Sequence, residues 1–112
     1  MTHNMKLNEI PFGKIKNGSK TIELRLYDDK RRKIKVGDSI CFKSETKKLN
    51  ATVKALHIFR SFDELYTALP LEKCGYSADE VANASPDDML EYYTEEQIKK
   101  YGVIGIEIEV TK

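Results

Sequence analysis

The sequence predicts an α+β domain in which a small curled sheet, or open β-barrel, carries a helical insertion before its C-terminal strand. Three patterns indicate this architecture. Apolar and polar residues alternate over residues 20–26 and 103–110, as in half-buried strands. The apolar positions change phase within residues 49–60, which is typical of a strand that bends at a bulge. Several helix-start patterns follow one another between residues 61 and 101.

The first third of the chain predicts a short helix that turns directly into a strand. Residues 10–17 place a proline in the first helical turn and two apolar residues, Phe12 and Ile15, three positions apart. A glycine suits the position just after this helix. Residues 20–26 then form a strand with an apolar stripe that is expected to face the core, made of Ile22, Leu24 and Leu26.

This helix-to-strand junction carries the principal candidate site. Lys20 begins the strand, and Glu23 and Arg25 share its polar face because side chains alternate along a strand. One interpretation is an ordinary ion pair on a solvated strand face. The other is a group of charges that lines a cleft, because a residue held between a packed helix and a packed strand can point into one.

A charged loop follows at residues 28–35. It either contacts phosphates or is simply a solvated loop, and it lacks aromatic side chains between its charges that could stack on bases. Together with two lysines of the first helix, it supplies the candidate phosphate contacts, which are Lys14, Lys16, Arg31, Arg32 and Lys33.

Two further strands are expected at residues 39–44 and 49–60. The phase change in the second lies around His57, which we interpret as a structural residue at the bend and not as a catalyst. The C-terminal strand at residues 103–110 is expected to pair with an earlier strand, and the strands at 20–26 and 39–44 are the available partners.

The segment between these strands predicts helices that cover one mouth or edge of the sheet. Capping-box spacing marks their starts at Ser61…Glu64, Ser77…Glu80, Ser85…Asp88 and Thr94…Gln97. Pro70 is expected to end the first helix and Gly102 the last. The tyrosines of this segment are more typical of core packing than of a stacking surface; they are Tyr92, Tyr93 and Tyr101.

Length and composition indicate one folded domain over residues 1–112, with no linker or repeat. Hydrophobic residues make up 40% and charged residues 33%, which excludes a disordered chain. No apolar run reaches the roughly 20 residues of a membrane span, and no secretory signal is visible. Cys41 and Cys74 lack a Cys-x-x-Cys partner, so they are interpreted as reduced thiols of a cytoplasmic protein without a metal or cofactor.

The net charge of +1 conceals a strong asymmetry. Residues 1–60 hold 15 Lys and Arg against 6 Asp and Glu, a balance of +9, whereas residues 61–112 hold 4 against 12, a balance of −8. A chain of this kind can present a basic surface to phosphates although the whole molecule is near neutral. The two halves can equally neutralise each other through internal ion pairs.

The junction and the order of elements resemble the ASCH domain, a relative of PUA-like barrels. The family motif Gly-x-Lys-x-x-Glu-x-Arg is matched by Gly18, Lys20, Glu23 and Arg25. The Gly-Asp turn at residues 37–38 and the ending from Tyr93 to Gly102 are also similar to small stand-alone bacterial members. The resemblance spans residues 7–110.

The resemblance implies a barrel with a cleft between sheet and helices, in which the motif side chains gather. The family is generally regarded as RNA-binding, so the expected partner is RNA or a nucleotide-like small molecule, bound by Lys20, Glu23 and Arg25. One branch consists of amidohydrolases that act on N4-acetylcytidine through the motif lysine, a threonine three residues later and a glutamate of the helical region. Here Glu23 replaces that threonine, and neither Glu72 nor Glu80 aligns reliably with the glutamate.

Three functions therefore remain open. The first is a module that binds RNA or a nucleotide. The alternative is a hydrolase acting on a modified nucleoside or on RNA, with Lys20 and Glu23 as the catalytic candidates. The adjacent carboxylate, however, stabilises the charged form of the lysine and so opposes a nucleophilic role for it. The third is a protein-interaction domain that uses the acidic insertion, for which a solvated helix face is the simpler explanation; its residues are Asp87, Asp88, Glu91, Glu95 and Glu96.

Overall fold

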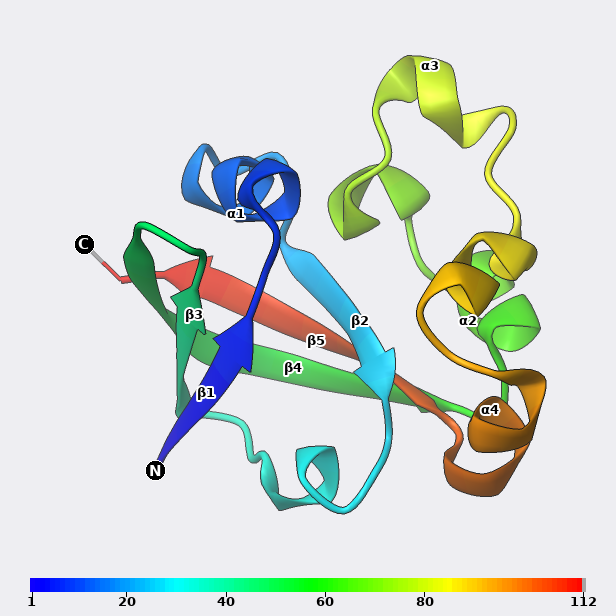
Figure 1. The fold of residues 1–112 in the computed structure, drawn as a ribbon, viewed down its shortest axis with the longest axis horizontal. Coiled ribbons are helices and arrows are strands. Elements are labelled where there is room, and N and C mark those ends of the chain that lie inside the picture. Colours follow the sequence, from blue (N-terminus) through cyan, green and yellow to red (C-terminus); the bar gives the residue numbers. More distant parts are fainter. Residues whose placement is uncertain (112) are drawn as a thin grey trace.

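The computed structural model describes residues 1–111 and shows one five-stranded sheet with helices at one end (Figure 1). The strands lie in the order β1-β3-β4-β5-β2, so β1 and β2 form the two edges. Only β1 and β3 pair in parallel, and all other pairs are antiparallel. The strands are β1 (Thr2–Lys6), β2 (Ile22–Leu26), β3 (Ser39–Lys43), β4 (Lys48–Phe59) and β5 (Val103–Val110).

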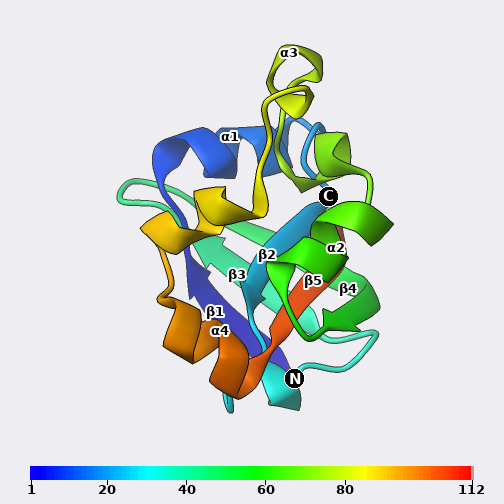
Figure 2. The ribbon, with the colours of Figure 1, turned by 90° about the vertical axis from the view of Figure 1, so that its right-hand side faces the viewer.

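The helices are short, and most belong to the segment between β4 and β5. Helix α1 (Glu9–Lys16) packs on the sheet, and a 3₁₀ turn η1 (Arg31–Lys33) lies in the charged loop. The insertion covers the end of β2 and β5, as Figure 2 shows. It contains α2 (Phe62–Ala68), η2 (Leu71–Cys74), α3 (Ala78–Val81), η3 (Pro86–Glu91) and α4 (Glu95–Tyr101).

The helix starts of the insertion are those that the capping spacing predicts. Ser77, Ser85 and Thr94 each accept a backbone hydrogen bond while the side chain three residues later returns one. Ser61 accepts from the backbone N–H of Glu64, which caps α2 from one side. Each cap satisfies donors that the first helical turn leaves free, and this allows several helices of seven residues or fewer to form.

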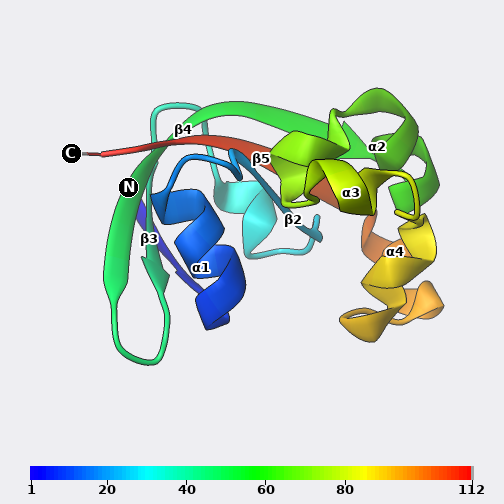
Figure 3. The ribbon, with the colours of Figure 1, turned by 90° about the horizontal axis from the view of Figure 1, so that it is seen from above.

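The sheet curls because β4 is bent. Val53 pairs with Ile108 and Ala55 with Glu107, so Lys54 is the extra residue of a bulge. This confirms the bend predicted from the phase change, although it lies three residues before His57. Figure 3 shows β4 arching along the outside of the curl. The predicted small curled sheet or open barrel with a helical insertion before the C-terminal strand is therefore confirmed.

One of the expected partners of the C-terminal strand needs correction. Strand β5 pairs with β2 as predicted, but its other partner is β4 and not the strand at 39–44. That strand instead lies between β4 and β1. The edge strand β1 was not foreseen, because only His3 and Met5 of its five residues face the core and its partner is distant in sequence.

The core has two parts, one on each face of the β2–β5 end of the sheet. Inside the curl, α1 buries Phe12 and Ile15 against β3, β4 and β5. Outside it, the apolar stripe of β2 packs under the insertion; the buried residues there are Ile22, Leu24, Leu26, Phe62, Leu65, Cys74, Met89 and Val103. No helix among residues 1–111 is both long and apolar enough to cross a membrane.

Candidate functional site

The stripe of β2 packs against the insertion, so the polar face of this strand points into the curl. Glu23 pairs with Ile106 and Arg25 with Ile104, two fully buried residues of β5. The Glu23 side chain is only 4% exposed. The expectation of an ordinary ion pair on a solvated strand face is therefore wrong for this strand, because both of its faces are covered.

The buried carboxylate of Glu23 is shared by the two cations of the motif. The Nζ of Lys20 lies 2.7 Å from Oε1, and the Nη2 of Arg25 lies 2.8 Å from Oε2, with a second bond from its Nε at 3.1 Å. Burial raises the pKa of Glu23, but the charges and hydrogen bonds of Lys20 and Arg25 outweigh it and hold the pKa below its usual value. Glu23 is thus an anion enclosed by two cations.

Arg25 also joins the two edges of the sheet. Its Nη2 donates to the backbone carbonyl of Lys6 at 2.9 Å, across the opening between β2 and β1. Lys30 makes a similar bridge to the carbonyl of Asn4 at 2.9 Å. These side chains satisfy carbonyls that an edge strand otherwise leaves free. The guanidinium of Arg25 therefore helps to close the open barrel, and its Nε and Nη2 are already committed to protein partners.

Lys20 is held at the junction by both neighbouring elements. Its backbone N–H donates to Lys14 at 3.0 Å, and the next residue, Thr21, donates to Lys73 of η2 at 2.8 Å. Its side chain passes over Gly75, where an added Cβ would lie 3.2 Å from the lysine Cδ. Gly75 has φ +110°, a conformation that favours glycine. The ammonium group donates to Glu23 and keeps two further donors.

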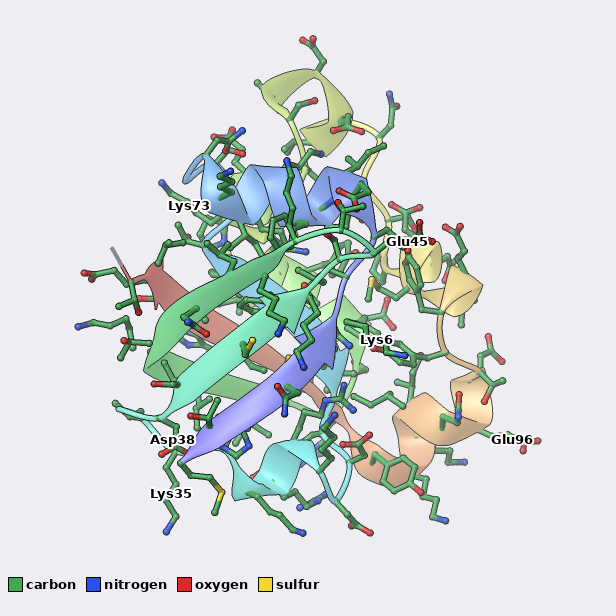
Figure 4. All side chains as sticks on the ribbon, turned by 60° about the vertical axis from the view of Figure 1, so that its left-hand side comes forward. Lys6, Lys35, Asp38, Glu45, Lys73 and Glu96 are labelled. Atoms are coloured by element: carbon green, nitrogen blue, oxygen red, sulfur yellow. The ribbon has the colours of Figure 1, made fainter. Side chains whose placement is uncertain are left out.

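The motif lines a cleft of about 950 Å³ between the sheet and the insertion. Figure 4 shows Lys6 at the end of β1, between these two parts. The cations that line the cleft are Lys6, Lys14, Lys20, Arg25 and Lys43, and its carboxylates are Glu23, Glu45, Glu80, Asp88 and Glu91. All five cations come from α1 or the sheet and its junctions, whereas three of the five carboxylates come from the insertion. The charge asymmetry of the sequence is thus repeated across the cleft.

The wall formed by the insertion is rich in tyrosine. Tyr66, Tyr76, Tyr92 and Tyr93 all line the cleft. Tyr93 stacks on Phe62 and is partly core, as predicted, but Tyr92 is 61% exposed and corrects the core interpretation for that residue. The hydroxyls of Tyr66 and Tyr76 lie 2.7 Å apart, and Tyr76 donates to Asp88 at 2.8 Å. Sequence reasoning did not single out Tyr66 or Tyr76, since nothing in their spacing sets them apart from core aromatics.

The other predicted phosphate contacts are dispersed. Lys14 lines the cleft, donates to the carbonyl of Gly75 at 2.7 Å and lies 3.7 Å from Glu80, whereas Lys16 is exposed outside it. The three residues of η1 also lie outside the cleft: Lys33 is exposed, Arg31 pairs with Asp28 at 3.1 Å, and Arg32 covers the ring of Tyr27 at 4.3 Å.

A second hollow of about 900 Å³ lies on another side of the insertion and contains Arg32 but no motif residue. Its walls mix both signs of charge, since Arg60, Lys99, Asp63 and Glu95 are all among its lining residues. Of the acidic insertion residues, Asp88 and Glu91 line the motif cleft, Asp87 and Glu95 line this hollow, and Glu96 points outward in Figure 4. The acidic residues thus do not form one face.

The residues of the cleft are poorly suited to act as nucleophiles or as metal ligands. Burial raises the pKa of the Cys74 thiol to about 11, although the positive charge of Lys20 opposes this shift. A nucleophilic lysine needs a free lone pair, whereas the Nζ of Lys20 lies 2.7 Å from a carboxylate oxygen. Within residues 1–111, no group of three or more His, Cys, Asp or Glu side chains is placed to hold a metal ion.

Comparisons with known proteins agree with the sequence motif. The family model of the ASCH domain matches residues 5–112, nearly the whole chain. The chain belongs to the ASCH family. This ASCH chain is similar to the crystal structure of hypothetical protein PH0355, with 41% identity, a TM-score of 0.84 and coverage of 99% of this chain and 100% of that one.

A solution structure of protein PF0455 from Pyrococcus furiosus is also similar, with 41% identity and a TM-score of 0.75. The match covers 100% of the ASCH chain and 99% of PF0455. A search of curated proteins found no match. The comparisons thus give the family and the fold of this ASCH protein, and its ligand has to be inferred from the cleft.

Proposed function

We propose that this ASCH protein binds RNA, or a nucleotide-like ligand, in the cleft between the sheet and the insertion. The observation that supports the proposal is the convergence of Lys20, Glu23 and Arg25 on one cleft of about 950 Å³. That volume lies within the roughly 300–1,000 Å³ of small-molecule sites. The cleft also combines the two groups that single-stranded RNA sites use, namely cations for phosphates and aromatic rings for bases.

The contacts within the cleft indicate a different role for each motif residue. Glu23 holds Lys20 in position, and Arg25 closes the barrel edge beside them. Lys20 keeps two ammonium hydrogens for a ligand, and Arg25 keeps those of its Nη1. Lys6 and Lys43 at the rim extend the positive wall toward the hairpin between β3 and β4. Tyr92, which is largely exposed, offers a ring on the opposite wall.

Binding is tested with labelled single-stranded RNA at two salt concentrations. The double variant Lys6→Ala/Lys43→Ala is expected to bind more weakly and to reduce the slope of log K against log salt by about 0.7 for each phosphate that these lysines neutralise in the wild type. Tyr92→Ala is expected to lose roughly 1–3 kcal/mol of binding free energy if a base stacks there. Lys54→Ala is the matched control, because this exposed lysine lies on β4 outside the cleft.

Lys20→Ala removes the central ligand donor but also leaves Glu23 with one cation, so its fold must be checked by thermal unfolding before its affinity is read. The rim and Tyr92 variants avoid this difficulty because they change exposed or peripheral positions. RNA as the ligand is refuted if wild-type protein binds no RNA at low salt. The proposal is equally refuted if the cleft variants and the Lys54 control bind alike.

A further inference from the structure

The insertion wall of the cleft contains a chain of hydrogen bonds whose direction is fixed. Tyr76 donates its single hydroxyl hydrogen to Oδ2 of Asp88 at 2.8 Å. The hydroxyls of Tyr66 and Tyr76 are 2.7 Å apart. Since Tyr76 has no second hydrogen, Tyr66 must donate its own to Tyr76. The oxygen of Tyr66 is then left with acceptor capacity only.

This chain links α2, the loop between η2 and α3, and η3. Asp88 also accepts from the backbone N–H of Ser85 at 3.2 Å, as part of the capping box of η3. The ring of Tyr66, on α2, lies edge-to-face against Phe62 at 6.4 Å and against Tyr76 at 5.9 Å between centroids. The three linked residues all line the motif cleft. The orientation of the free acceptor is thus set by packing before any ligand arrives.

The charged groups of the same wall are hydrogen-bond acceptors, like the oxygen of Tyr66. The carboxylates of Glu80, Asp88 and Glu91 line it, and ionised carboxylates only accept hydrogen bonds. The opposite wall carries the lysines, which only donate. A ligand carbonyl placed against Tyr66 and these carboxylates therefore meets acceptors and loses its hydrogen bond with water. A ligand amino group there finds a partner.

We propose, on the basis of the function proposed above, that the insertion wall selects an unpaired base with an exocyclic amino group, cytosine or adenine, over uracil. Tyr66 accepts a hydrogen bond from that amino group, and the phosphate lies on the lysine side of the cleft. Cytosine and uracil provide the sharpest comparison, because they have nearly the same shape and differ by an amino group or a carbonyl at the ring position that faces the wall.

The test compares oligo(C) and oligo(U) of equal length in the same titration at neutral pH. Wild-type protein is expected to prefer oligo(C) by roughly five- to tenfold, the effect of one hydrogen bond gained against one lost. Tyr66→Phe removes the acceptor and is expected to abolish this preference by weakening oligo(C) binding. Tyr76→Phe instead frees the hydrogen of Tyr66, which can then donate to a carbonyl, so the preference falls because oligo(U) binds more tightly.

Tyr101→Phe is the matched control, since it removes a tyrosine hydroxyl outside both the motif cleft and the chain of hydrogen bonds and is expected to keep the preference. If Tyr76→Phe proves poorly folded by thermal unfolding, Tyr66→Phe still decides the matter because it alters only the free end of the chain. Equal wild-type affinities for oligo(C) and oligo(U), or a preference unchanged in Tyr66→Phe, overturn this inference and leave RNA binding intact. Binding of neither oligonucleotide overturns both.

Discussion

Replacing Glu23 with glutamine is expected to destabilise the protein strongly. The substitution keeps the size of the side chain but removes the negative charge between Lys20 and Arg25, whose side chains are only 11% and 15% exposed. Removing one partner from a buried ion pair leaves uncompensated charge in a poorly solvated place and costs about 3–5 kcal/mol. For a domain of this size, such a loss lowers the melting temperature by roughly 10–20 °C.

Urea unfolding of wild type and Glu23→Gln measures the effect, and an unchanged m-value shows that the unfolded state is unaffected. Glu109→Gln is the matched control. Glu109 lies 3.9 Å from Lys54 in an exposed pair, so its replacement is expected to change the free energy of unfolding by less than about 1 kcal/mol. If Glu23→Gln costs no more than this control, the account of Glu23 as the anion that holds the site together is refuted.

Two further predictions concern the stability of the fold outside the cleft. The pKa of Asp38 is lowered to about 2 by its hydrogen bonds to His3 and the Lys35 backbone. Wild-type protein should therefore lose stability as the pH falls from about 4 to 2. Asp38→Asn should abolish this part of the acid dependence when unfolding is measured as a function of pH. Gly102→Ala should cost roughly 1–3 kcal/mol by thermal unfolding, because φ is +74° and the new Cβ would lie 2.9 Å from the Phe59 carbonyl; Gly37→Ala, with φ +93° and open space, should cost less.

The features that the sequence could predict are those set by local chemistry. The capping residues Ser77, Ser85 and Thr94 begin helices where they were expected, because a cap acts within four residues. The bulge in β4 was visible because side chains alternate with a period of two, and one extra residue reverses the phase. The motif Gly18–Arg25 could be located for the same reason, as a junction between two periodic segments.

Features that depend on distant parts of the chain could not be predicted. Glu23 occupies the polar face of β2, and only the tertiary structure shows that this face is turned into the curl, because the insertion covers the apolar side instead. Strand β1 has few apolar residues and forms through parallel pairing with β3. The hydrogen-bonded chain from Tyr66 to Asp88 joins α2, the loop before α3, and η3, so no spacing in the sequence reveals it.

The most direct test of the cleft as the ligand site is an NMR titration of the ¹⁵N-labelled protein with single-stranded RNA. The account predicts that amide shifts change in β2 and its junction with α1, near Gly75, and in η3 up to Tyr93, which together surround the cleft. Shifts confined to the hollow beside Arg32 or to the outer face of α4 would contradict it, as would no shift at any RNA concentration.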